Sequence, residues 1–210
     1  GEIVVGEDSP GAAVPAEPLE CAGAMTAIMK DAINPTLMQT TEGTAAFIHC
    51  GPFANIAYGN SSVLQDRIAL RLADYTVTES GFGADRGFEM RENVKSRGTE
   101  LRPDATVVVV TVRAMKAHDP RFKIVAGKPL DPELLEKDLG AMEIGLENLR
   151  RHIEIVRRHG IPPVVAVNRF GTDHQEEIDL ILKKALEFGA EDAAVSEVHA
   201  RGGAGGAALA

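Results

Sequence analysis

The stretch DATVVVVTVRAMK, Asp104–Lys116, carries the strongest strand signal in the chain. Four valines stand in succession at Val107–Val110, and valine is a β-branched residue that favours extended backbone. A continuous apolar run without alternating polar residues is typical of a strand buried on both faces, as in a parallel sheet covered by helices. We therefore expect this strand to lie inside such a sheet.

The sequence that follows predicts a strand–helix–strand unit. Residues 132–158 carry apolar side chains at spacings of three and four, the pattern of a helix with one apolar face, and Gly160 and Pro162 then end it. IPPVVAVNRF, residues 161–170, repeats the apolar strand pattern, so the crossover should be right-handed. A further helix and a further strand follow in HQEEIDLILKKALEFGA (174–190) and EDAAVSEVHARGG (191–203). This alternation predicts an α/β fold with a mostly parallel sheet flanked by helices.

The signals upstream of this unit are shorter. Residues 1–16 are rich in turn residues and are expected to form a lead segment, followed by a single α/β region over residues 17–210. Four local elements are expected in the first part of that region: a helix over Glu17–Ile33, an extended piece with a turn at Gly43, a helix capped by Ser61 or Ser62, and a short strand in YTVTES (75–80).

Composition excludes several classes of protein. The formal net charge of the 210-residue chain is −9, which argues against a general nucleic-acid binder. Two cysteines make no disulfide framework and favour a reduced, cytoplasmic protein. No apolar run approaches the roughly 20 residues that span a bilayer, and no signal peptide is visible. The chain starts at Gly1 and stops in a glycine-rich run, so we expect it to be part of a longer protein.

Polar and aromatic side chains follow each predicted strand. Ligands of open parallel sheets bind outside the carboxyl ends of the strands, so these residues are the first candidates for a site. They are Glu79, Ser80, Gly81, Phe82, Gly83, Ala84 and Asp85; Arg113, Lys116 and His118; Asn168, Arg169, Phe170, Thr172 and Asp173; and Ser196, Glu197, His199, Arg201, Gly202 and Gly203. Such a concentration suits a pocket for a polar, partly aromatic ligand.

Each of these groups also has a purely structural interpretation. The glycines of GFGADRG, residues 81–87, could only set turn geometry, Asn168 and Asp173 could be turn or cap residues, and Arg113 and Lys116 could be solvated. The chain contains no GxGxxG, GxSxG or GxxxxGK[ST] motif, and its scattered histidines do not indicate a metal site. The residues alone therefore lead to a parallel α/β domain with a polar ligand cleft.

Five longer blocks carry a more specific signal. They are PTLMQTTEGTAAFIHCGPFANIAYGNSSV (35–63), TVTESGFGADRG (76–87), LRPDATVVVVTVRAMKAHD (101–119), VVAVNRFGTD (164–173) and VSEVHARGGAGG (195–206). In this order they resemble blocks of formate–tetrahydrofolate ligases, also called formyltetrahydrofolate synthetases, and the similarity runs from about residue 17 to the end. The resemblance implies a P-loop NTPase-like architecture, present here in part. The phosphate loop of the family is not among these residues, so an internal fragment is expected.

The resemblance also implies an activity. Members of this family use ATP and Mg²⁺ to convert formate into formyl phosphate, and the amine of tetrahydrofolate then attacks the formyl carbon to give 10-formyltetrahydrofolate. Phosphate is a good leaving group, and positioning with charge neutralisation does most of the work in phosphoryl transfer. A homotetramer and activation by a monovalent cation are also implied.

Site residues follow from the matching motifs. NRF places Phe170 against the pterin ring, and Phe82 matches a second aromatic residue near it. His199 stands where the family block SEVWAKGG has tryptophan, so it would stack with less area and with a pH-dependent charge. The matching blocks also supply residues expected to line the nucleotide or folate cleft: Asn168, Arg169, Ser196, Glu197, Gly202 and Gly203.

Two alternatives stay open beside the ligase. One is a non-catalytic fragment or degenerate paralogue with only a folding, folate-binding or assembly role. The other is an unrelated α/β nucleotide-binding module such as a GTPase, although NRFGTD, residues 168–173, is not the guanine-reading NKxD.

The loop IHCGPFANIAYGNSS, Ile48–Ser62, combines glycines, amides and aromatic residues. It matches the family block HGGPFANIAHG, with Cys50 in place of a glycine and Tyr58 in place of a histidine. Its backbone N–H groups and the start of the following helix could meet an anion at the ligand site. A structural connector or a subunit contact is the alternative.

Overall fold

The computed structural model describes residues 2–50, 60–125 and 127–210. Contacts divide the chain into two compact units, Gly1–Cys50 with Ser61–Val77 and Gly51–Asn60 with Thr78–Ala210. The sequence-based division at residue 16 stays a prediction.

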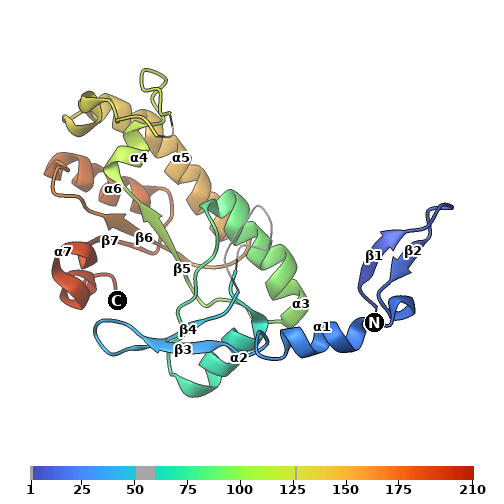
Figure 1. The fold of residues 1–210 in the computed structure, drawn as a ribbon. Coiled ribbons are helices and arrows are strands. Elements are labelled where there is room, and N and C mark those ends of the chain that lie inside the picture. The colour runs from blue at the N-terminus through green and yellow to red at the C-terminus, as the bar shows by residue number, and fades with distance from the viewer. Residues whose placement is uncertain (1, 51–59, 126) are drawn as a thin grey trace. The chain divides into compact units, whose positions relative to one another are not determined.

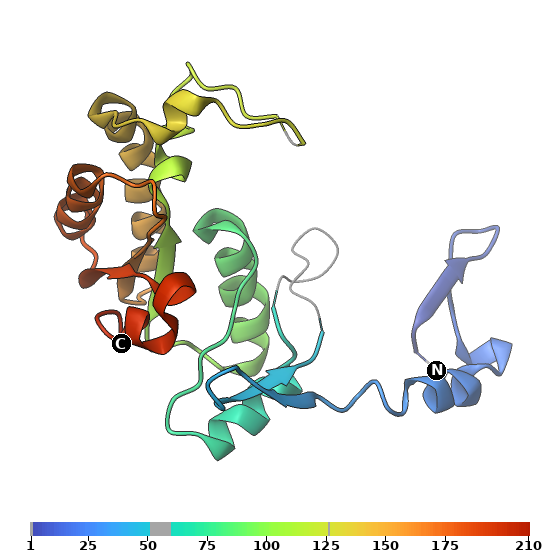
Figure 2. The same ribbon diagram turned by 60° about the vertical axis from the view of Figure 1, so that its left-hand side comes forward.

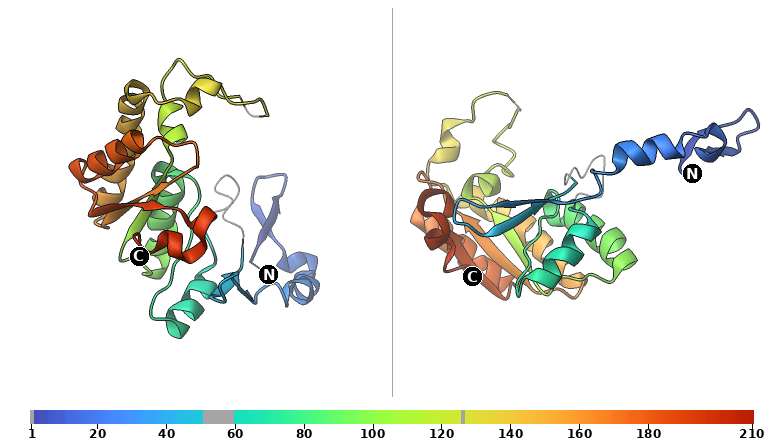
Figure 3. Two further views of the ribbon diagram at one scale, coloured as in Figure 1. Left: turned by 90° about the vertical axis from the view of Figure 1, so that its left-hand side faces the viewer. Right: turned by 60° about the horizontal axis from the view of Figure 1, so that its bottom comes forward.

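Two antiparallel hairpins and two short helices make up the described part of the first unit (Figures 1 and 3). The elements are β1 (Val4–Glu7), β2 (Ala13–Pro15), the 3₁₀ turn η1 (Glu17–Leu19), α1 (Ala22–Met29), β3 (Thr36–Gln39), β4 (Ala45–Ile48) and α2 (Val63–Leu72). The Ser62 hydroxyl accepts the Gln65 amide at 3.0 Å, so the predicted cap of α2 is confirmed. The predicted turn at Gly43 is also confirmed, with φ +82°.

Two predictions for this part of the chain were wrong. The helix expected over Glu17–Ile33 is only α1, because Glu20 adopts a left-handed conformation with φ +52° and separates η1 from α1. The strand expected in residues 75–80 does not form, apart from one bridge between Asn60 and Ser80. Tyr75 and Val77 are almost fully exposed, so this run buries no apolar face that would hold it in a sheet.

A parallel three-stranded sheet forms the centre of the second unit (Figure 1). Its strands lie in the order β5 (Thr106–Val110), β6 (Pro163–Asn168) and β7 (Asp192–Ser196). The helical elements are η2 (Gly83–Phe88), η3 (Arg91–Ser96), α3 (Arg97–Thr99), α4 (Val112–Lys116), η4 (Pro132–Leu135), α5 (Leu139–Arg158), α6 (Gln175–Glu187), α7 (Val198–Arg201) and η5 (Gly202–Gly206). The second unit is therefore α/β, with helices flanking a parallel sheet, consistent with part of a P-loop-like architecture.

The predicted strand–helix–strand unit is confirmed as β5, α5 and β6, but the helix starts at Leu139 and not at residue 132, because extended Glu136 separates η4 from α5. Asp138 starts α5 by accepting the Ala141 amide at 2.9 Å, and Gly160 follows its end with φ +76°. Helices α5 and α6 pack against the sheet (Figure 2). Their apolar side chains form one core with inward residues of β5 and β6. The core includes Val110, Val165, Val167, Met142, Leu146, Leu149, Ile153, Ile178 and Ile181. Burying each such side chain contributes roughly 1.5–3 kcal/mol.

The helical stretch from η2 to α3 was not expected from the sequence. Most of it has wide π-type turns, and Phe88 is its main apolar anchor in a small core with Ile155, Val156 and Ile161. Gly83 has φ +73°, and a Cβ atom at Gly87 would overlap the backbone carbonyl of Gly81. The glycines of this segment are therefore needed for the backbone geometry, as their structural interpretation proposed.

The structure corrects the expected burial of the valine run. Val110 is buried and Val108 packs against the core, but Val107 is 50% and Val109 65% exposed. The strand that is buried on both faces is β6, where Val165, Ala166 and Val167 are all at most 2% exposed. The difference arises because β6 is the central strand and β5 lies at an edge of the described sheet.

Candidate functional site

Several of the predicted site residues meet at the carboxyl edge of the parallel sheet. Asn168 ends β6 and lies opposite Ser196, which ends β7. The Arg169 amide donates to the Ser196 carbonyl oxygen at 3.1 Å, so the backbone continues this pairing one residue beyond the strand. The structure therefore brings Asn168, Arg169 and Ser196 together, as expected for two neighbouring parallel strands.

Glu197 joins two arginines at this edge. One carboxylate oxygen lies 3.3 Å from the guanidinium of Arg169 and the other lies 3.0 Å from that of Arg201. The Glu197 amide donates to the Gly205 carbonyl oxygen at 2.9 Å, which fixes the start of the α7–η5 turn against β7. One carboxylate serves two guanidinium groups, so a positive charge remains for an anionic group of a ligand.

Phe170 lies in the loop directly after β6 and is 37% exposed. The guanidinium carbon of Arg113, from α4, lies 4.3 Å from the ring centroid, a cation–π contact. The Phe170 amide donates to the Asp173 carboxylate at 2.8 Å, which closes the loop and shows that Asp173 has the turn role foreseen for it. Arg113 was predicted from the sequence to follow a strand end, but its contact with Phe170 was not predicted, because that contact depends on tertiary packing.

The contacts described above do not include His199, Gly202, Gly203 or Phe82. His199 is exposed on α7, and Gly202 and Gly203 are exposed on the turn that follows. Phe82 is 91% exposed at the start of η2. A shared folate pocket for Phe82, Phe170 and His199 stays a prediction.

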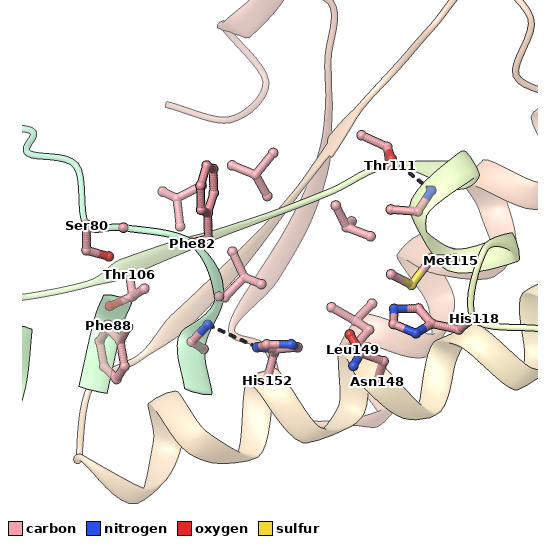
Figure 4. A pocket seen from close by; sticks show the side chains of 18 residues that line it. Ser80, Phe82, Phe88, Thr106, Thr111, Met115, His118, Asn148, Leu149 and His152 are labelled. Atoms are coloured by element: carbon pink, nitrogen blue, oxygen red, sulfur yellow. Dashed lines mark hydrogen bonds between the residues drawn. The ribbon is translucent and has the colours of Figure 1, made fainter. Parts of the chain in front are cut away.

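Phe82 instead lines a hollow of about 420 Å³ beside β5. Figure 4 shows Phe82 and Phe88 toward one end of this hollow and Met115 and His118 toward the other. The His152 ring accepts the Ala84 amide at 3.0 Å, which attaches η2 to α5. Neither Phe170 nor His199 lines this hollow.

A buried ion pair lies behind the carboxyl edge. The Lys116 ammonium is 3.1 Å from a Glu177 carboxylate oxygen, and the side chains are 2% and 0% exposed. Lys116 also donates to the Glu136 carbonyl oxygen at 2.8 Å, and Glu177 accepts the Asp138 amide at 2.8 Å. Lys116 is therefore not solvated, and it connects α4 to the first turn of α6.

Two carboxylates next to this pair are held by Arg121. Hydrogen bonds from the Arg121 side chain and amide lower the pKa of Asp119. The Ala141 amide and then the Arg121 guanidinium lower the pKa of Asp138. Both carboxylates therefore stay ionised and hold the segment that precedes α5.

The loop Ile48–Ser62 lies mostly outside the described residues, so its proposed anion-binding role stays a prediction. At its described ends, the His49 ring bonds the Ser62 hydroxyl at 2.7 Å and the Ala32 carbonyl oxygen at 2.8 Å. Cys50 has φ +60°. The His49 contacts hold Ser62, the cap of α2, in place, and they do not test whether the loop binds a ligand.

Comparison with known proteins identifies the family. The family described as formate–tetrahydrofolate ligase matches residues 1–210. The chain belongs to the formate–tetrahydrofolate ligase family. It is 56% identical to the formate–tetrahydrofolate ligase of Saccharopolyspora erythraea, 52% to that of a Roseiflexus species and 51% to that of Desulforamulus reducens.

Each of these alignments covers the whole of this chain but only 37% of the relative. The chain therefore spans little more than a third of the length of these ligases. No helix in the described ranges is long and apolar enough to cross a membrane.

Proposed function

We propose that this chain is part of an ATP-dependent formate–tetrahydrofolate ligase, which converts formate to formyl phosphate and then forms 10-formyltetrahydrofolate. The observation that carries the proposal is the family match over residues 1–210. The names of the relatives support formate and tetrahydrofolate as substrates.

The carboxyl edge of the sheet is the part of the chain best suited to bind the folate. Phe170 offers a partly exposed aromatic ring on which a planar pterin can stack, and Asn168 offers an amide beside it. Arg169 and Arg201 share one carboxylate, so they favour an anionic group such as a folate carboxylate. Phe82, Ser196, His199, Gly202 and Gly203 are kept as further lining residues on the strength of their motifs.

The residues of this chain do not by themselves fit the triphosphate of ATP with Mg²⁺. The sequence has no GxxxxGK[ST] loop, the motif whose backbone N–H groups and lysine hold the phosphates of ATP. We therefore assign the phosphate loop to ligase segments outside these 210 residues, and keep ATP, Mg²⁺ and a monovalent cation as cofactors of the ligase. The residues proposed to line the nucleotide or folate cleft remain Asn168, Arg169, Ser196, Glu197, Gly202 and Gly203. A homotetramer in the cytoplasm completes the proposal.

A second candidate is a non-catalytic fragment that folds or assembles without turnover. The observation in its favour is that the chain spans only 37% of its relatives. The two candidates are separated by a chimera in which these 210 residues replace the aligned segment of the Saccharopolyspora erythraea ligase. We expect the chimera to form 10-formyltetrahydrofolate from ATP, formate and tetrahydrofolate. If the chimera folds but forms no 10-formyltetrahydrofolate, the non-catalytic candidate is favoured.

The folate site is tested in the same chimera. Phe170→Ala should raise KM for tetrahydrofolate by about tenfold, because the lost stacking is worth about 1.4 kcal/mol. KM for ATP and formate should not change. His199→Trp should lower KM for tetrahydrofolate, and Tyr75→Ala, at an exposed aromatic residue of the first unit, is the control. An unchanged KM for tetrahydrofolate in both site variants would contradict this placement of the folate.

A further inference from the structure

The outer edge of β5 carries backbone groups that have no hydrogen-bond partner among the described residues. The Thr106 amide donates to the Pro162 carbonyl oxygen at 3.0 Å, which sets the direction in which each residue of β5 points its backbone. In the alternating pattern of a parallel pair, Val108 and Val110 also face β6, while Val107 and Val109 direct their N–H and C=O groups away from it. No described residue hydrogen-bonds to the backbone of Val107 or Val109.

The same two residues leave an apolar surface open. Helix α5 packs on the face of the sheet that Val110 and Val165 share. The side chains of Val107 and Val109 point to the opposite face, where they are 50% and 65% exposed. Parallel sheets are normally covered on both faces, so this face of β5 lacks the cover that its sequence is suited to.

An apolar edge strand such as β5 is prone to pair with a further strand. Natural proteins protect edge strands with charged residues, proline or bulges, and β5 has none of these between Thr106 and Val110. The hollow of about 420 Å³ borders every residue of β5 and has Phe82 and Phe88 on its wall. It therefore offers space for apolar side chains next to the unpaired backbone groups.

We propose that a β-strand from the ligase polypeptide outside these 210 residues pairs with the outer edge of β5 and seats its apolar side chains in this hollow. The relatives have the chain length to supply it, because these residues correspond to only 37% of their sequence. The added strand hydrogen-bonds to Val107 and Val109 and continues the sheet beyond β5. This inference rests on membership of the family and not on the proposed reaction, so activity is not its readout.

Hydrogen exchange of individual backbone amides tests the proposal. The 210-residue chain alone is compared with the same residues carried in the Saccharopolyspora erythraea chimera. In the chain alone, the amides of Val107 and Val109 should exchange rapidly and those of Val108 and Val110 slowly. In the chimera, the outward amides should slow by about 100-fold or more, because they become part of a sheet ladder. Equal exchange in the two proteins would overturn the proposal.

A second copy of the chain is the competing partner. If the outward amides of the chain alone become protected as its concentration rises, β5 pairs between copies and the proposal is wrong. A variant gives an independent test in the chimera: Val109→Lys should restore rapid exchange at Val107, since an edge lysine opposes strand addition. The matched control is Leu186→Lys on α6, at a position 52% exposed, which should leave that exchange slow. Retained slow exchange at Val107 in the Val109→Lys chimera would also overturn the proposal.

Discussion

The buried pair of Lys116 and Glu177 makes the sharpest prediction about stability. Lys116→Met keeps the length of the side chain and removes its charge, leaving the Glu177 carboxylate buried at 0% exposure without its cation. The carboxylate would keep one hydrogen bond, from the Asp138 amide, and its second oxygen has no hydrogen-bond partner among the described residues. The Glu136 carbonyl oxygen would also lose its donor.

The expected cost follows from this geometry. Removing one partner of a buried ion pair destabilises a protein by about 3–5 kcal/mol, because a charge is left in a medium of low dielectric. A loss of about 4 kcal/mol lowers the folding equilibrium constant roughly 1,000-fold. In the double variant Lys116→Met/Glu177→Leu no charge stays buried, so it should be more stable than Lys116→Met alone.

Urea unfolding followed by far-ultraviolet circular dichroism measures the loss as a shift in the midpoint. Lys137→Ala is the matched control, because the Lys137–Glu176 pair also ends on the first turn of α6, at 2.8 Å, but is 43% and 59% exposed. That control should cost less than about 1 kcal/mol. If Lys116→Met costs no more than Lys137→Ala, or if the double variant is the least stable of the three, the reasoning from burial is refuted.

Two further predictions concern the segments around α5. The Ala141 amide and then the Arg121 guanidinium lower the pKa of Asp138, so its ionised form stabilises the fold above the ordinary carboxyl pKa of about 4, and this contribution is lost as pH falls through the lowered pKa. The melting temperature of Asp138→Asn should therefore depend less on pH in the acid range than that of the unchanged chain. An unchanged pH dependence would count against Asp138 as the cap of α5. Gly145→Ala places a Cβ atom against the Met115 carbonyl and should lower the free energy of unfolding in urea by about 1–3 kcal/mol. Gly98→Ala, with open space around the new Cβ atom, should not destabilise the fold. Equal effects of the two substitutions would contradict the close approach of α4 and α5.

Local sequence patterns were sufficient for the elements that local physics controls. The apolar stripe of α5, the Ser62 cap of α2 and the positive φ of Gly43 and Gly160 were all readable, because each depends on residues within a few positions along the chain. The pattern failed for residues 75–80, where β-branched and aromatic residues are present but no neighbour buries them.

The residues of the candidate site could be predicted from the sequence, but the contacts between them could not. Parallel strands place their carboxyl ends at one edge, so the neighbourhood of Asn168, Arg169 and Ser196 followed from topology. The stacking of Arg113 on Phe170 could not be foreseen, because it depends on how α4 packs against a loop more than 50 residues away in the chain.

The sequence by itself determined that Thr106–Val110 is a strand and, through its specific blocks, which family the chain belongs to. Only the tertiary structure decided which valines of that strand are covered and that Lys116 is buried beside Glu177. The physical reason is that propensity and motif are properties of consecutive residues, whereas burial and charge pairing depend on which distant segments come into contact.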